Sequence, residues 1–158
     1  MKQAISSTDI ALIECVNVIR NKWRIRFDVT SNEDGSISYL EEEFNYRPSL
    51  EEIKSLIIDY FNSKVAEEIK TGFVWNEKSI WLSQENQMNY KSAFDLAVQT
   101  AGENLPVRFK FGDQSSEYHI FKDVDELKDF YLKMNKHINS ALEKGWIAKD
   151  SIDWKMYY

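Results

Sequence analysis

The sequence predicts an α+β fold in which small antiparallel β-hairpins, or a small sheet, pack with three main α-helices. Two observations carry this prediction. Segments in which apolar and polar residues alternate, as in half-buried strands, come in pairs separated by turn residues. Longer segments with apolar residues three and four positions apart, as on one face of a helix, follow those pairs. This hairpin–helix order is typical of small antiparallel sheets packed on helices.

The first clear element is a β-hairpin. Residues 22–30 alternate apolar and charged side chains, residues 32–35 (NEDG) have the composition of a turn, and residues 36–45 return as a second strand. Residues 10–19 are mixed in character and are compatible with an earlier strand. We therefore expect two or three strands before the first helix.

Charge pairing indicates the register of that hairpin. A four-residue loop pairs Ser31 with Ser36, and so places Arg26 opposite Glu41. The same loop places Arg24 opposite Glu43, whereas a two-residue loop would set Asp28 against Glu41. Because a cross-strand pair contributes about 0.2–1 kcal/mol and like charges repel, we favour the four-residue loop. The run Glu41 to Glu43 is then a set of structural partners, although a metal site is the alternative.

Three helices follow from capping and periodicity. Ser49-Leu50-Glu51-Glu52 is a capping box that starts the first helix, and Ser83 lies where the second helix needs an N-cap. Asp123 and the acidic residues after it start the third. The predicted helices run from Ser49 to about Lys70 with Gly72 as the stop, from Ser83 to Gly102, and from Asp123 to Gly145.

Two further hairpins lie between the helices. Apolar runs at residues 73–75 and 80–82 flank a polar turn at residues 76–79. A strand over residues 106–111 is followed by a turn at residues 112–116 and by a strand over residues 118–121. The chain thus alternates pairs of strands with helices.

Composition and length fit a single domain with short extensions. The chain has 158 residues, of which 43% are hydrophobic and 14% aromatic, which is ample for a core. With two prolines and five glycines, it has no Pro/Gly-rich linker, and no internal repeat is evident. We expect a polar arm over residues 1–9, one α+β domain over residues 10–147 and an aromatic tail over residues 148–158.

Charge and cysteine content limit the classes of partner. The net charge is −6 and the charges are interspersed, which argues against nucleic acid as a partner. Cys15 has no second cysteine to pair with, and a buried thiol is favoured over a reactive one. The charged N-terminal residues predict no signal peptide, and the longest uncharged stretch, residues 96–102, is shorter than the ~20 residues of a membrane helix. We expect an intracellular protein without a membrane partner.

One candidate site is the aromatic group where the second hairpin meets the second helix. Trp75, Trp81 and Tyr90 lie there with the amides Asn86 and Gln87. The structural interpretation is that the tryptophans pack on the following helix while the amides satisfy backbone groups of the turn. The alternative is a partner-binding surface, for which Trp, Tyr and amides are well suited. We favour the structural interpretation.

The second candidate site is the aromatic tail. Trp154, Tyr157 and Tyr158 follow the last predicted helix. Docking on a partner, or on a neighbouring copy, and docking on its own domain are equally consistent with the sequence. The partner-binding candidates are therefore Trp75, Trp81, Asn86, Gln87, Tyr90, Trp154, Tyr157 and Tyr158.

Catalytic, metal and cofactor motifs are not evident in the sequence. His119 lies in a predicted strand and is interpreted as a solvated or pair-forming residue, and His137 lies on a predicted helix and is interpreted as a surface residue. The glycines are dispersed, so no phosphate-binding loop is predicted. We expect no catalytic, metal or cofactor-binding residue and no enzyme activity. A glycan-active enzyme with paired carboxylates is the alternative.

Three segments resemble a known family. GFVWNEKSIWLSQENQMNYKSAFDLAVQT, LPVRFKFGDQSSEYHIFKDVDELKDFY and GWIAKDSID are similar to small proteins encoded by phages and prophages of Bacteroides-type bacteria. That family is similar to an uncharacterised domain of phage tail and tail-fibre proteins. The resemblance covers about residues 22–153, and the pattern W-L-S-x-E-N-Q-x-N-Y-K is its most distinctive part.

The resemblance implies a structural or adaptor subunit of a bacteriophage virion, made in the bacterial cytoplasm. Its place would be the tail or the tail-fibre attachment, and it would act through protein–protein contacts. The implied partners are tail, fibre or portal-side proteins, or copies of itself. A tail-fibre assembly chaperone that is absent from the finished virion is the alternative. If the tail docks on a partner, we expect deletion of residues 151–158 to weaken incorporation while leaving the fold intact.

Overall fold

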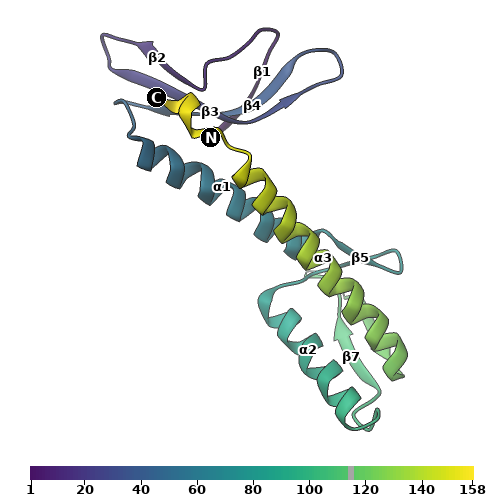
Figure 1. Cartoon of the computed structure of the whole chain (residues 1–158). Helices are drawn as coiled ribbons and strands as arrows, with labels where there is room; N and C mark the ends of the chain where they lie inside the picture. The colour runs from purple at the N-terminus through teal and green to yellow at the C-terminus, as the bar shows by residue number, and fades with distance from the viewer. Residues whose placement is uncertain (114–115) are drawn as a thin grey trace. The chain divides into compact units, whose positions relative to one another are not determined.

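A computed structural model describes residues 1–113 and 116–158 and confirms the α+β class, with three α-helices and antiparallel sheets (Figure 1). The chain forms two compact units, where the sequence predicted one domain over residues 10–147. Unit 1 comprises residues 1–60 and 149–158, and unit 2 comprises residues 61–148. The helices α1 (Leu50–Thr71) and α3 (Val124–Asp150) each contribute residues to both units.

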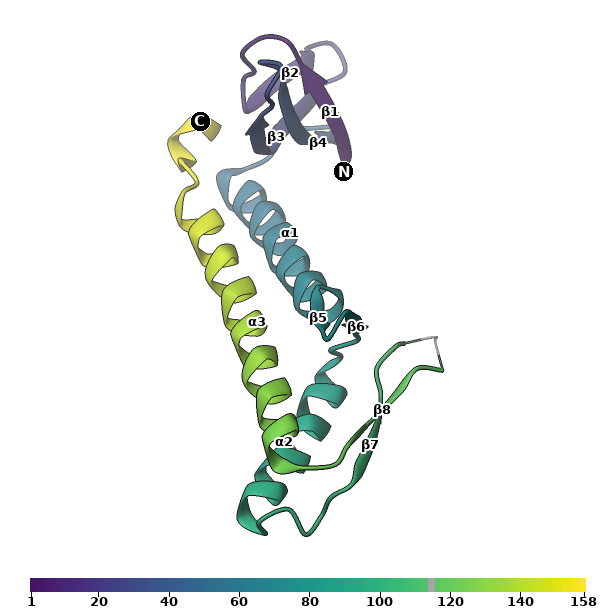
Figure 2. The same ribbon diagram turned by 90° about the vertical axis from the view of Figure 1, so that its right-hand side faces the viewer.

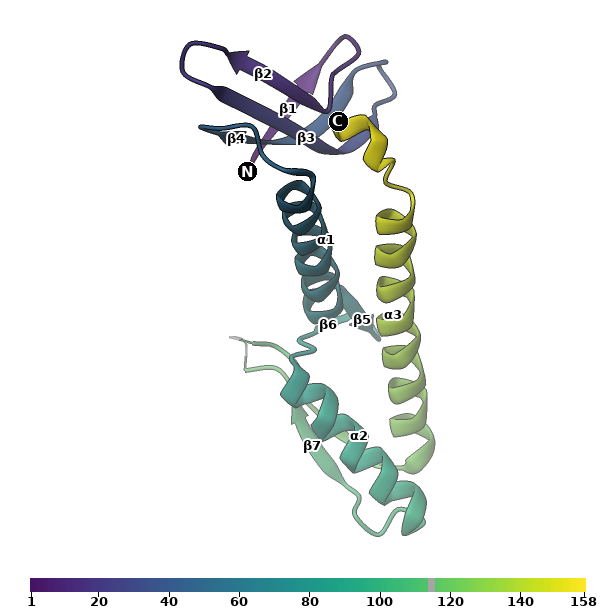
Figure 3. The ribbon, with the colours of Figure 1, turned by 60° about the vertical axis from the view of Figure 1, so that its left-hand side comes forward.

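Unit 1 is built on a four-stranded antiparallel sheet with the order β1-β4-β3-β2. The strands are β1 (Lys2–Ser6), β2 (Ile13–Asn17), β3 (Lys22–Ser31) and β4 (Ile37–Phe44). The first turns of α1 lie on one side of this sheet (Figure 3), where the rings of Phe27 and Tyr60 are 5.3 Å apart.

The N-terminal residues form a strand, so the predicted polar arm over residues 1–9 is wrong for residues 2–6. β1 pairs along its length with β4, from Lys2 opposite Glu41 to Ser6 opposite Ile37. An edge strand is held by backbone hydrogen bonds and needs no apolar alternation. Its polar sequence therefore carried no strand signal.

The charge-based register of the β3–β4 hairpin is confirmed for both predicted pairs. Arg26 lies opposite Glu41 and Arg24 lies opposite Glu43. Nearer the turn the register shifts between Phe27 and Thr30, and Ser31 faces Ile37 instead of the predicted Ser36. An extra residue on β3 causes this bulge.

The bulge has a side-chain anchor. Asp28 has a positive φ of 52°, and its Oδ2 accepts a hydrogen bond of 2.6 Å from the Tyr60 hydroxyl on α1. The predicted capping box of α1 is also confirmed. The Ser49 amide donates to Glu52 Oε2 at 2.8 Å, and the Glu52 amide donates to Ser49 Oγ at 3.2 Å. Both features fix where α1 leaves the sheet.

Unit 2 contains two short hairpins and two helices besides the second part of α1. In chain order they are β5 (Phe73–Trp75), β6 (Lys78–Ile80), α2 (Gln84–Gln99), β7 (Val107–Lys110), β8 (Tyr118–Phe121) and α3. Figure 2 shows the β7–β8 hairpin beside the first half of α3. The predicted turn at residues 112–116 includes Gln114 and Ser115, which lie outside the described residues.

The β5–β6 turn is shorter than predicted. Asn76 and Glu77 form it, with positive φ values of 48° and 65°, while Lys78 and Ser79 belong to β6. A two-residue turn with both φ values positive matches the twist of a hairpin. The prediction of a turn over residues 76–79 is therefore wrong, because polar side chains on the solvent face of a strand resemble a turn in sequence.

The core of unit 2 is an aromatic cluster around Phe130 of α3. The Phe130 ring lies 5.3 Å from Trp75, 4.9 Å from Tyr90 and 5.1 Å from Phe121. Strands β5 and β8 and helix α2 thus meet α3 at one side chain. Edge-to-face and offset aromatic pairs of this kind add about 0.5–1.5 kcal/mol each to the burial of apolar area.

Gly145 does not end the third helix, which continues to Asp150. The prediction of a stop at Gly145 is wrong because this glycine serves close packing. A Cβ built at Gly145 would lie 2.3 Å from Cγ2 of Val65 on α1. The absence of a side chain at this position therefore lets the two helices approach each other within unit 2.

Candidate interaction site

The aromatic bend that the sequence singled out belongs to the core of unit 2. Trp75 is 2% exposed, and its Nε1 donates a 3.0 Å hydrogen bond to Asp129 Oδ2. The hydrogen bond from Lys133 and, to a smaller extent, the bond from Trp75 lower the pKa of the Asp129 carboxyl. Tyr90 is also buried, and burial raises the pKa of its hydroxyl to about 12. Trp75 and Tyr90 offer no surface to a partner.

The amides at the bend satisfy the backbone, as the structural interpretation predicted. Asn86 Nδ2 donates to the Trp81 carbonyl at 2.9 Å, and Gln87 Nε2 donates to the Leu82 carbonyl at 2.8 Å. The predicted N-cap is confirmed, since Ser83 Oγ accepts from the Asn86 amide at 3.2 Å. Trp81 itself is half-buried, with the Lys70 ammonium 5.1 Å from its ring centroid.

The aromatic tail docks on its own unit. Residues 154–157 form the short 3₁₀-helix η1, and Tyr157 is 4% exposed. Its hydroxyl donates a 2.8 Å hydrogen bond to the Arg26 carbonyl in β3, and burial raises its pKa to about 12. Trp154 is half-buried beside Lys54 of α1, 5.6 Å from the ring centroid, whereas Tyr158 is exposed. Tyr157 is thus a structural residue of unit 1.

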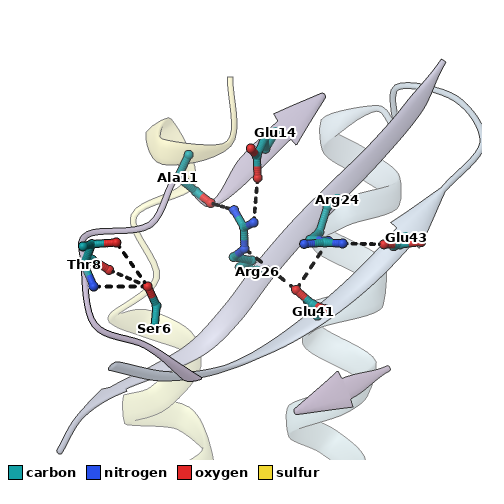
Figure 4. Close-up of polar contacts among 8 residues, drawn as sticks. All are labelled: Ser6, Thr8, Ala11, Glu14, Arg24, Arg26, Glu41 and Glu43. Carbon is teal, nitrogen blue, oxygen red and sulfur yellow. Dashed lines mark hydrogen bonds and ion pairs between the residues drawn. The ribbon is translucent and has the colours of Figure 1, made fainter. Parts of the chain in front are cut away.

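A network of charged side chains joins three strands of the unit 1 sheet (Figure 4). Arg26 is buried, and its two terminal nitrogens donate to the Ala11 carbonyl at 2.7 Å and to Glu14 Oε2 at 2.6 Å. The buried Glu41 has its Oε2 3.4 Å from Arg24 Nε and 4.0 Å from Arg26 Nε. A buried arginine held by two acceptors fixes the strands that supply them. This network ties β2 to β3 and β4.

The outer end of the network is more exposed. Arg24 Nη2 donates to Glu43 Oε1 at 2.6 Å, which lowers the pKa of Glu43 and raises that of Arg24. An open hollow of about 360 Å³ beside this pair is lined by Met1, Lys2, Arg24, Glu41, Glu42 and Glu43. The carboxylates of Glu41 and Glu43 pair with Arg24, and that of Glu42 pairs with the Met1 amine. Each of the three carboxylates that line the hollow thus has a cationic partner.

The turn that joins β2 to β3 exposes two aliphatic side chains. We define the hairpin tip as residues 18–21 (Val-Ile-Arg-Asn), between the last residue of β2 and the first residue of β3. Val18 is 82% exposed and Ile19 is 98% exposed. Turns normally carry Gly, Asn, Asp, Pro or Ser, so two adjacent β-branched aliphatic residues are unusual there. The sequence pattern did not predict this feature, because both residues fall within the possible strand over residues 10–19.

The hairpin tip is held by specific hydrogen bonds. The Arg20 amide donates to Asn17 Oδ1 at 3.0 Å, and the Asn21 amide donates to the Val18 carbonyl at 3.2 Å. Asn21 has a positive φ of 48°, and its Oδ1 accepts a 2.9 Å bond from Trp23 Nε1. These contacts define one conformation for the turn, in which Val18 and Ile19 are displayed to solvent.

Unit 2 has an exposed apolar pair of its own. Trp146 is 56% exposed and Ile147 is 63% exposed, and both lie on α3 next to the buried Gly145. We call these two residues the α3 patch. An exposed tryptophan on a helix is a typical anchor of a protein contact.

Both histidines make contacts within unit 2, and the pairing of His119 is one of the two interpretations that the sequence allowed. His119 Nε2 lies 2.8 Å from Glu126 Oε1, and its ring stacks on Phe111 at 5.3 Å. His137 Nε2 lies 3.0 Å from the Glu68 carbonyl. Within residues 1–113 and 116–158, no three His, Cys, Asp or Glu side chains gather into a group that could hold a metal ion. In the same part of the chain no helix has the length and apolarity to cross a membrane.

Comparison with known proteins finds no match to this chain among family models, curated proteins or solved structures.

Proposed function

We propose that the chain is an adaptor subunit of a bacteriophage particle, at the tail or at the attachment of the tail fibres, that acts through contacts with other proteins. The observation that carries the proposal is that each compact unit exposes its own apolar group. Unit 1 has the hairpin tip with Val18 and Ile19, and unit 2 has the α3 patch. A subunit that joins two others needs one contact surface for each.

Physical chemistry supports a protein contact at these groups. Burying an exposed Val, Ile or Trp side chain at an interface removes apolar area from water, which is worth about 1.5–3 kcal/mol for a fully buried aliphatic side chain. A preformed turn loses little conformational entropy when it binds, so more of that gain appears as affinity. The phage setting rests on the resemblance of residues 22–153 to phage and prophage proteins.

Mass spectrometry of purified particles tests this proposal. We expect the chain in particles at a constant ratio to a tail protein, across preparations and after a high-salt wash. A chain found in producing cells but absent from purified particles contradicts the proposal and identifies the assembly chaperone instead.

A matched pair of variants tests the role of the α3 patch. We expect Trp146→Ser to lower the number of copies per particle by about tenfold or more, as for a hot-spot tryptophan. Leu132→Ser, which changes another exposed apolar residue on the same helix, is the control and is expected to change the copy number by less than about twofold. Equal incorporation of both variants would remove the α3 patch from the proposal.

A further inference from the structure

The structure assigns a partner chemistry to the hairpin tip. We infer that the tip inserts Val18 and Ile19 into an apolar pocket of a different protein of the particle, and that carboxylates border this pocket. This inference rests on the proposed function, and it adds the chemistry of the surface that receives unit 1. Its basis is the exposure, the fixed geometry and the charge of the tip.

Exposure and geometry make the tip suitable for insertion. Ile19 is almost fully exposed, and Val18 beside it projects from the same turn. The turn is closed by the bond between the Asn21 amide and the Val18 carbonyl, and Trp23 holds the Asn21 side chain. The Arg47 guanidinium lies 5.1 Å from the Trp23 ring centroid, on the side chain that anchors the tip. The backbone that carries the two aliphatic groups is therefore held in one conformation before any partner binds.

The charged network of Figure 4 stabilises the β2–β3 hairpin that carries the tip. Arg26 bonds both to Glu14 of β2 and to the Ala11 carbonyl just before β2. β2 is an edge strand, and these charge-assisted bonds hold it to the rest of the sheet. The tip thus stands on a rigid hairpin.

The charge beside the tip is positive, although the charge of Lys22 also helps to lower the pKa of Glu43, after the larger effect of Arg24. Arg20 lies in the tip and Lys22 follows it, and neither forms an ion pair within the described part of the chain. The carboxylates on neighbouring strand positions have partners of their own, Glu14 with Arg26 and Glu43 with Arg24. A partner with carboxylates around its pocket would match Arg20 and Lys22 in charge.

Charge also decides between classes of occupant. Two identical tips would bring four cations together, which disfavours a contact between the tips of two copies. A lipid surface would have to be anionic to attract Arg20 and Lys22, and the chain as a whole carries a net charge of −6. A separate protein with an apolar pocket and an acidic rim fits both the aliphatic and the cationic groups.

Site-specific crosslinking in assembled particles tests this inference. A benzophenone amino acid replaces Ile19 in the full chain, and in a control chain it replaces Ile5, an exposed aliphatic residue on β1 of the same unit. We expect the residue-19 probe to crosslink to one other particle protein, at a peptide that contains apolar and acidic residues. The residue-5 probe should not give this product. Crosslinks from residue 19 to a second copy, to lipid or to a surface without carboxylates would overturn the inference.

Incorporation of variants gives a second readout. We expect Ile19→Ser to lower the number of copies per particle by about tenfold or more, and Ile5→Ser by less than about twofold. Arg20→Glu should lower it several-fold, by about three- to tenfold, by placing a carboxylate against the acidic rim. Because the exposed side chain of Ile19 makes little contact within the chain, the thermal unfolding of the free Ile19→Ser protein should equal that of the wild type.

These readouts separate two kinds of failure. Absence of the wild-type chain from particles contradicts the proposed function. Presence of the wild type together with equal incorporation of Ile19→Ser and Arg20→Glu contradicts the inference about the tip and leaves the proposed function in place.

Discussion

The contact between Gly145 and Val65 predicts that a better helix former will destabilise unit 2. Replacing Gly145 by Ala adds one methyl group inside α3. In an isolated helix this change is favourable by about 0.8–1.0 kcal/mol. In the structure, however, the new Cβ would lie 2.3 Å from Val65 Cγ2, well inside van der Waals contact. The two effects therefore oppose each other.

The steric effect is expected to dominate. Overpacking of a close contact costs about 1–3 kcal/mol, and Val65 is β-branched with one strongly preferred rotamer on a helix, so it relieves the overlap poorly. After the gain in helix propensity is subtracted, Gly145→Ala should lower the free energy of unfolding by about 1 kcal/mol, within a range of about 0–2 kcal/mol. The overlap disappears if Val65 is first replaced by Ala, because the clashing Cγ2 is then gone.

A double-mutant cycle measured by urea denaturation isolates this contact. In the Val65→Ala background, Gly145→Ala should raise the free energy of unfolding by about 1 kcal/mol, so the interaction energy of the cycle should be about 1–3 kcal/mol. Ser140→Ala, at an exposed position of the same helix, controls for propensity alone. A stabilising effect of Gly145→Ala in the wild-type background, or an interaction energy near zero, would refute the packing argument.

Three further predictions concern buried polar groups. Tyr157→Phe removes the 2.8 Å bond to the Arg26 carbonyl and should cost about 1 kcal/mol in urea denaturation, whereas Tyr158→Phe, on an exposed residue, should change the stability by less than about 0.5 kcal/mol. In Arg26→Lys, the single ammonium cannot replace the two terminal nitrogens that donate to the Ala11 carbonyl and Glu14, so the free energy of unfolding should fall by about 2 kcal/mol. Arg24→Lys, in a more exposed pair, should lower it by less than about 1 kcal/mol. Equal losses for the two variants would contradict the role of the network. The pKa values of Tyr90 and Tyr157 are raised to about 12 from 10.0, so their contribution to stability is complete below pH 10 and is lost as the pH rises to 12. Urea denaturation between pH 10 and pH 12 should show the free energy of unfolding falling by about 2–3 kcal/mol for each of the two tyrosines. In Tyr157→Phe, the part of this fall that is due to Tyr157 should be absent.

Local signals predicted much of the fold. The capping box at Ser49 and Glu52 forms because it satisfies orphan amides at the start of α1, and the residues alone specify it. The pairing of Arg26 with Glu41 was also predictable, since like charges exclude the alternative register. Such features depend on a few neighbours in sequence or on one hairpin partner.

Other features depend on distant neighbours and were missed. β1 is held by backbone pairing with β4, which side-chain periodicity does not report. Gly145 resembled a helix stop in the sequence. A glycine is needed there because Val65, about eighty residues earlier in the chain, leaves no room for a side chain. In each case the cause is a contact that exists only after the chain has folded.

The candidate site was predicted in part. The predicted role of the amides Asn86 and Gln87 is confirmed by their hydrogen bonds to the backbone. Trp75 is buried as a structural residue, but it contacts Asp129 and Phe130 of α3, where the sequence predicted packing on the following helix. For the tail, the sequence left two alternatives, and the bond from Tyr157 to β3 selects docking on its own unit. The predicted intact fold after deletion of residues 151–158 is therefore replaced by an expected loss of stability.

The aliphatic residues of the hairpin tip are visible in the sequence, but their pattern alone did not predict an exposed turn. Val18 and Ile19 fall at the end of the possible strand over residues 10–19, whereas β2 ends at Asn17 and leaves both residues in the turn before β3. Aliphatic β-branched residues stabilise strands and are poorly suited to turns. An apolar pair at an obligatory turn is thus a sign of a contact surface, and it becomes visible only when the strand ends are known.

Hydroxyl-radical footprinting of the chain, free and within purified particles, tests the central claim most directly. If the chain works by docking its exposed tip, the reactivity of Val18 and Ile19 should fall several-fold, by about three- to tenfold, on incorporation. Trp75 should react little in either state. Unchanged reactivity of Ile19 in the particle, or a Trp75 that reacts strongly in the free chain and becomes protected on assembly, would contradict the account.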